Sequence, residues 1–155
     1  MARVIHHDAL GRATSTVSYD PAHQAYQILH WGFVAAPAIA GIDKFVGLLT
    51  NWDQYLCPQF ARISPLTPHG TMLAVGIVEM LAGLIVAIRP RIGAYVVAAW
   101  LVAIIVDLLL LGSFYDIALR DFGLCLGALA LGRLSQMYDR PHVSTEFDRS
   151  VARTD

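Results

Sequence analysis

The sequence has few charged residues for its length. They make up 15% of the 155 residues, against about 25% in soluble globular domains. Hydrophobic residues reach 56%, above the roughly 45–50% of such domains. This leaves too little polar surface to cover a water-soluble body of this size, so much of the surface is expected to face lipid. The formal net charge of −1 and the lack of a basic cluster argue against a nucleic-acid partner.

Recognisable cysteine motifs and a signal peptide are also missing. Cys57 and Cys125 form neither a CxxC pair nor a zinc-ligand pattern, so we predict no metal site and no disulfide framework. A lone thiol such as Cys57 would be open to pairing with a partner if it lay in an oxidising compartment. Residues 1–20 lack the apolar run that a signal peptide needs. We therefore expect the first apolar segment to stay in the mature protein as an anchor.

Long apolar runs are what the sequence does have. A helix needs about 20 mostly apolar residues to cross a hydrocarbon layer of about 30 Å, at about 1.5 Å per residue. Proline, glycine and charged residues separate the runs, and the proline-rich stretch 51–70 is the longest connection. The predicted fold is all-α: a four-helix transmembrane bundle in residues 26–134, between an N-terminal segment 1–25 and a polar tail 135–155. The four predicted spans are 26–49, 70–88, 92–112 and 117–134.

The distribution of lysine and arginine predicts the orientation of these spans. Cytoplasmic loops carry the excess of positive charge. Both termini and the turn at Arg89-Pro90-Arg91 are therefore expected on the cytoplasmic side, and the long first loop outside. One side receives Arg3, Arg12, Arg89, Arg91, Arg133, Arg140, Arg149 and Arg153, and the other receives only Lys44, Arg62 and Arg120.

Ionisable residues also occur inside the predicted spans. Each costs on the order of 2.5–3.5 kcal/mol to insert, so such groups usually face the interior and have partners. Counting about 1.5 Å per residue, one set lies roughly 5–9 Å below the outer boundary, and Glu79 lies about 14 Å below it. The shallower set comprises Asp43, Lys44, Asp107, Arg120 and Asp121.

Two interpretations of this polar layer stay open. In the functional one, Lys44, Glu79 and Asp107 converge on an outward-facing pocket that holds a small ligand or a quinone headgroup, or relays protons. Asp43, Arg120 and Asp121 complete the polar network around it. In the structural one, the same charges only neutralise one another and fix the register of the helices.

Small residues in the spans predict close helix packing. The Gly123 and Gly127 spacing would suit a dimer interface, but packing inside a four-helix protein is the commoner use of such a pattern.

Four short motifs resemble the DoxX-like family of four-helix bacterial membrane proteins. They are Gly41–Phe45 (GIDKF), Gly76–Gly83 (GIVEMLAG), Arg91–Ala94 (RIGA) and Arg120–Leu124 (RDFGL). The resemblance covers residues 26–134. The long first loop and the polar tail depart from a typical short member.

The resemblance implies a role in a redox system of the bacterial cytoplasmic (inner) membrane. DoxX-like proteins are associated with membrane parts of oxidoreductases, including thiosulfate:quinone oxidoreductase, and the family's recurring Lys and Glu would correspond to Lys44 and Glu79. We expect a membrane subunit or accessory protein of a quinone-linked complex, not catalytic on its own, with lipid and other redox subunits as partners and a quinone as its only candidate cofactor. The alternatives are a purely structural membrane scaffold and a small proton-coupled transporter. No ionisable residue follows Glu79 between Met80 and Ile88, which counts against transport.

Overall fold

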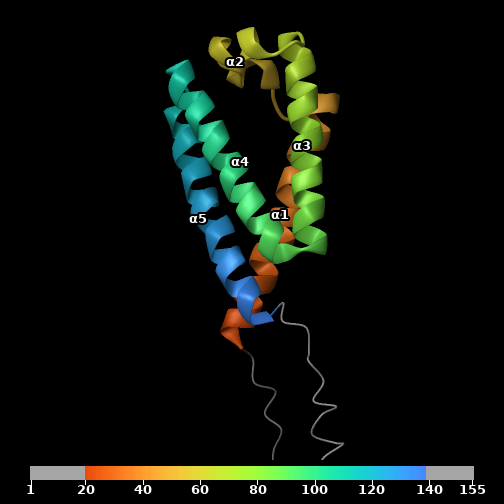
Figure 1. The fold of residues 1–155 in the computed structure, drawn as a ribbon, viewed down its shortest axis with the longest axis vertical. Helices are drawn as coiled ribbons and strands as arrows, with labels where there is room; N and C mark the ends of the chain where they lie inside the picture. Colours follow the sequence, from red (N-terminus) through yellow and green to blue (C-terminus); the bar gives the residue numbers. More distant parts are fainter. Residues whose placement is uncertain (1–19, 139–155) are drawn as a thin grey trace, which may run out of the picture.

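The structure is a computed structural model that describes residues 20–138, and within this part every regular element is a helix, as predicted (Figure 1). The greater part of the predicted N-terminal segment and tail, residues 1–19 and 139–155, lies outside the described residues. The elements are α1 (Pro21–Val46), the short 3-10 helix η1 (Trp52–Tyr55), α2 (Pro58–Ile63), α3 (Pro68–Ile88), α4 (Pro90–Leu111) and α5 (Tyr115–Tyr138).

Local capping residues determine where α1 begins and ends. Asp20 caps the helix by accepting a 3.0 Å hydrogen bond from the N–H of Ala22, and Pro21 occupies the first turn, where its missing N–H costs nothing. The helix therefore begins before the predicted start at residue 26. At the other end Gly47 adopts a left-handed conformation with φ of 69°, which suits glycine, and the helix stops at Val46.

The other long helices follow the same logic. Thr67 caps α3 through its hydroxyl, which accepts a 3.1 Å hydrogen bond from the N–H of Gly70. Arg89 alone separates α3 from α4, because Pro90 cannot continue the α3 hydrogen-bond ladder but can start a new helix. Gly112, with φ of 70°, ends α4. Helix α5 continues to Tyr138, beyond the predicted limit at residue 134.

The four long helices pack mainly as two antiparallel pairs, α1 with α3 and α4 with α5 (Figure 1). We call the end that holds η1 and α2 the α2 end, and the opposite end the Arg89 end. The Tyr138 hydroxyl donates a 2.6 Å hydrogen bond to Asp20 and so joins the end of α5 to the start of α1. This bond holds the pKa of the Asp20 carboxyl below its usual value. The apolar core lies toward the Arg89 end and includes Phe33, Ala82, Val86, Ala94, Val97, Leu101, Ala128 and Leu131.

Three of these helices, α1, α3 and α4, are long and apolar enough to cross a membrane. Their outer surfaces expose many large aliphatic side chains, as a lipid-facing surface would. Helix α5 has the length of a span, but Asp116, Arg120, Asp121 and Arg133 dilute its apolar character. The described residues therefore indicate a helical membrane protein.

Glycine permits the closest approach between α1 and α3. A Cβ placed on Gly41 would lie 2.5 Å from the carbonyl oxygen of Gly76, and one placed on Gly76 would lie 2.8 Å from that of Gly41. Neither helix can carry a side chain here without moving away from the other. Gly32, on the same α1, has no such neighbour within 4 Å.

We predict that Gly41→Val destabilises the protein by about 1–3 kcal/mol, as overpacking of a close contact does. The measurement is the free energy of unfolding in mixed detergent micelles. Gly32→Val is the matched control and should be neutral or slightly stabilising, because its added side chain meets open space and valine is a better helix former than glycine. Equal destabilisation by both variants would contradict the packing described here.

Candidate functional site

A buried ion pair joins α1 to α3. The Lys44 ammonium donates a 2.6 Å hydrogen bond to Oε2 of Glu79, and the side chains are only 3% and 10% exposed. Lys44 reaches Glu79 because the glycine contact at Gly41 and Gly76 brings the two backbones together one turn away. The sequence predicted that these two charges would converge, and the structure brings them into direct contact.

Trp52 of η1 covers the ion pair from the α2 end. Its ring lies with its centroid 3.7 Å from the Lys44 ammonium, a cation–π contact. The indole N–H of the same residue donates a 2.7 Å hydrogen bond to Asp43. One aromatic side chain therefore touches both neighbouring charges at the end of α1.

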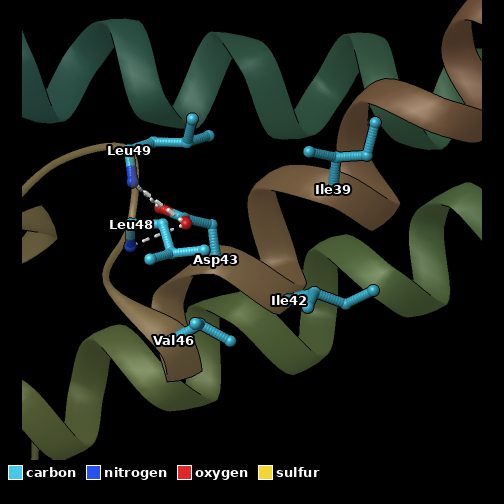
Figure 2. A pocket seen from close by; sticks show the side chains of 6 residues that line it. All are labelled: Ile39, Ile42, Asp43, Val46, Leu48 and Leu49. Carbon is cyan, nitrogen blue, oxygen red and sulfur yellow. Dashed lines mark hydrogen bonds between the residues drawn. The ribbon is translucent and has the colours of Figure 1, made fainter.

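Asp43 holds the chain that leaves α1. Its carboxylate accepts hydrogen bonds of 3.0 and 3.1 Å from the backbone N–H groups of Leu48 and Leu49. Figure 2 shows the carboxylate turned toward these two residues within a small recess of about 270 Å³ whose other side chains are aliphatic. Three donors thus satisfy a carboxylate that is only 6% exposed, and its role is to fix the loop.

Arg120 and Asp121 form a second ion pair on α5. The Arg120 Nε donates a 3.0 Å hydrogen bond to Oδ1 of Asp121. Asp121 is buried, whereas the Arg120 side chain is 64% exposed. Asp121 also interacts electrostatically with Lys44 and Glu79, so the two ion pairs share one region.

Asp107 was predicted to converge with Lys44 and Glu79, but the hydrogen bond found for it joins it to the loop. Its Oδ1 accepts a 3.1 Å hydrogen bond from the backbone N–H of Cys57, the residue before α2. This bond ties α4 to the start of α2, and Asp107 is not among the residues that line the cavity described below. Cys57 itself is fully buried, and burial raises the pKa of its thiol.

A cavity of about 760 Å³ separates the two helix pairs, and both ion pairs lie in its wall. Its size is within the range of ligand sites, which are mostly apolar with a few polar groups. The wall is predominantly apolar and combines side chains from α1, α3, α4, α5 and η1. Its polar members are Lys44, Thr50, Trp52, Tyr55, Glu79, Trp100, Arg120 and Asp121.

Trp100 on α4 places a hydrogen-bond donor at this cavity. Its indole Nε1 is buried and forms no hydrogen bond of good geometry among the described residues. The Glu79 carboxylate is the acceptor beside it, and the two side chains interact. A ligand acceptor in the cavity could therefore share this N–H with Glu79.

Sequence reasoning missed Trp100, although a signal for it exists. Glu79 precedes the single-residue turn at Arg89 by nearly the same number of residues as Trp100 follows it. In two antiparallel helices joined this tightly, such residues lie at the same depth. Counting outward from the turn would have paired them.

Comparison with known proteins finds no matching family model and no similar curated protein or solved structure.

We predict that Lys44→Met destabilises the protein by about 3–5 kcal/mol, because it leaves the Glu79 carboxylate buried without its partner. Adding Glu79→Leu should recover most of this loss, since an apolar pair of similar volume leaves no buried charge without a partner. Arg62→Met, which removes an exposed cation of α2, is the control and should change stability by less than about 0.5 kcal/mol. A double variant no more stable than Lys44→Met would contradict the pairing.

Proposed function

We propose that this protein is a membrane subunit that holds a quinone in the cavity between its two helix pairs, for a redox partner in the same membrane. The observation that carries the proposal is the cavity itself. It combines a long apolar wall with the Lys44–Glu79 pair and the buried N–H of Trp100. A quinone has matching chemistry, since its ring carries carbonyl acceptors and its tail is apolar.

The polar groups of the cavity would orient such a ring. Trp100 offers one N–H to a carbonyl oxygen, and the Lys44 ammonium has donors beyond the one that binds Glu79. The bound quinone would supply the electron-carrying chemistry. The chain's own residues would bind the ring, fix its orientation and exclude water. The resemblance of Gly41–Phe45 and Gly76–Gly83 to DoxX-like motifs supports the same assignment.

Transport is less well supported than binding. Toward the Arg89 end the wall of the cavity consists of apolar side chains, which offer no polar group to a solute; they are Ile28, Leu29, Phe33, Ala82 and Val97.

We further propose that α5 is a fourth span and that both termini face the cytoplasm. The contact between Tyr138 and Asp20 supports this, because it returns the end of α5 to the side where α1 begins. A helix of 24 residues is roughly 36 Å long, enough to cross the layer that α4 crosses. Its charges at Arg120 and Asp121 line the cavity.

Binding is tested by titrating purified protein in mild detergent with decylubiquinone and measuring heat. The wild type should bind, and Trp100→Phe should bind about fivefold more weakly, because it loses one hydrogen bond worth about 1 kcal/mol. Trp31→Phe is the matched control, since Trp31 is exposed on α1 and does not line the cavity. No binding by the wild type, or equal affinity of wild type and Trp100→Phe, would reject the proposal.

Orientation is tested with reporter fusions in bacteria. We expect green fluorescent protein to fluoresce at either terminus, because both lie on the cytoplasmic side. Alkaline phosphatase inserted between Pro65 and Leu66, in the segment that joins α2 to α3, should be active, since this segment would lie outside. An active phosphatase at the C-terminus would mean that α5 does not span, and one at both termini would invert the orientation.

A further inference from the structure

Several residues line the cavity and yet are exposed on the outer surface of the protein. The residues that share this property are Ile28, Gly32 and Ala36 of α1, Leu49 in the loop after α1, and Arg120 and Leu124 of α5. Residues of this kind mark the opening of a cavity. The opening, which we call the α1–α5 mouth, therefore lies between these two helices.

The closure of α1 against α5 ends at one contact. A Cβ placed on Gly127 would lie 3.3 Å from the Phe33 ring, so the helices touch there. Gly32, one residue before Phe33, is unobstructed, with no atom within 4 Å of a Cβ placed on it. The mouth therefore extends from the level of the Phe33–Gly127 contact toward the α2 end, where Ala36 and Leu124 line it.

The mouth reaches mid-depth of a membrane span at Gly32. Gly32 is roughly 17 Å from the start of α1 and roughly 21 Å from its end, counting about 1.5 Å per residue. Because α1 is long and apolar enough to cross the bilayer, this position faces hydrocarbon rather than water. A molecule that enters at this level must be dissolved in the lipid.

From this geometry we infer that the cavity takes its ligand laterally from the bilayer, and that the ligand is a tailed amphiphile whose apolar tail occupies the α1–α5 mouth. The inference rests on the proposed quinone site and specifies the class of quinone, one with a long apolar chain. The headgroup lies inside, at Trp100 and Lys44, and the chain extends past Gly32 and Ala36 into the lipid.

Arg120 gives the mouth its only charged side chain. Its Nε is held by Asp121, which leaves the other guanidinium N–H groups free to donate to oxygen atoms of an entering headgroup. The remaining wall of the mouth is glycine, alanine, leucine and isoleucine, which suits a hydrocarbon chain. A ligand that enters through the mouth would thus contact one charged side chain, Arg120, and otherwise only apolar residues.

The test blocks the mouth without touching the headgroup contacts. Gly32→Phe and, independently, Ala36→Phe are titrated at equilibrium with decylubiquinone and with its tailless analogue ubiquinone-0. Each variant should lose at least about tenfold in affinity for the tailed quinone, about 1.4 kcal/mol, and keep the wild-type affinity for the tailless one. Ala99→Phe, at an exposed position of α4 outside the cavity wall, is the control and should bind both as the wild type does.

The possible outcomes separate this inference from the proposed function. If the wild type binds both quinones and the mouth variants bind both equally well, the lateral mouth is wrong while the quinone site stands. If the mouth variants lose the two quinones equally, the substitutions disturb the headgroup site and the inference is also wrong. Failure of the wild type to bind either quinone would reject the quinone site itself. Gel filtration and circular dichroism confirm that the variants are folded, which the open space at Gly32 leads us to expect.

Discussion

The rest of the structure depends on the ion pair between Lys44 and Glu79. Either charge alone would be costly in a hydrocarbon interior, so the pair must form at hydrogen-bond distance, and it does so at 2.6 Å. Such a distance requires α1 and α3 to approach closely, which only glycine at positions 41 and 76 permits. The charges and the glycines therefore form one unit. The charges fix the register of the two helices, and the glycines make that register sterically possible.

The loop between α1 and α3 extends this unit. Trp52 can cover Lys44 only when Asp43 holds both its indole N–H and the backbone at Leu48 and Leu49. The two adjacent residues at the end of α1 thus have different partners. Lys44 lines the cavity, and Asp43 binds the loop. Tyr55, in the same short helix, packs its ring against Phe114 after α4, with centroids 4.9 Å apart. The loop therefore bridges both helix pairs above the cavity and keeps them at a fixed separation.

The sequence predicted the helical class because a helix that crosses hydrocarbon needs a minimum length of apolar residues. It predicted the approximate limits of the long helices because proline and glycine interrupt the apolar runs. It also predicted that Lys44 and Glu79 would meet, since the cost of isolated charges applies to any fold. It could not place Asp107, whose partner is a backbone N–H of Cys57 that no residue pattern reveals. The apolar composition of three helices is confirmed. Spanning by α5 stays a prediction, because its four charged residues lower the mean hydropathy of the helix.

The two ends of the molecule differ in a way that bears on selectivity. Toward the Arg89 end the helices close on small residues, with Gly132 against the Tyr95 ring and Gly127 against Phe33. Toward the α2 end the helix pairs separate around the cavity. In a bilayer an apolar opening of this kind would not stay empty, and a lipid acyl chain would compete for it. Shape alone cannot favour a quinone over such a chain. The polar side chains of the wall, Lys44, Trp100 and Arg120, would do so, because an acyl chain offers their N–H groups no acceptor whereas a carbonyl oxygen does. Discrimination against the bulk lipid would therefore depend on a few donors in an otherwise apolar wall.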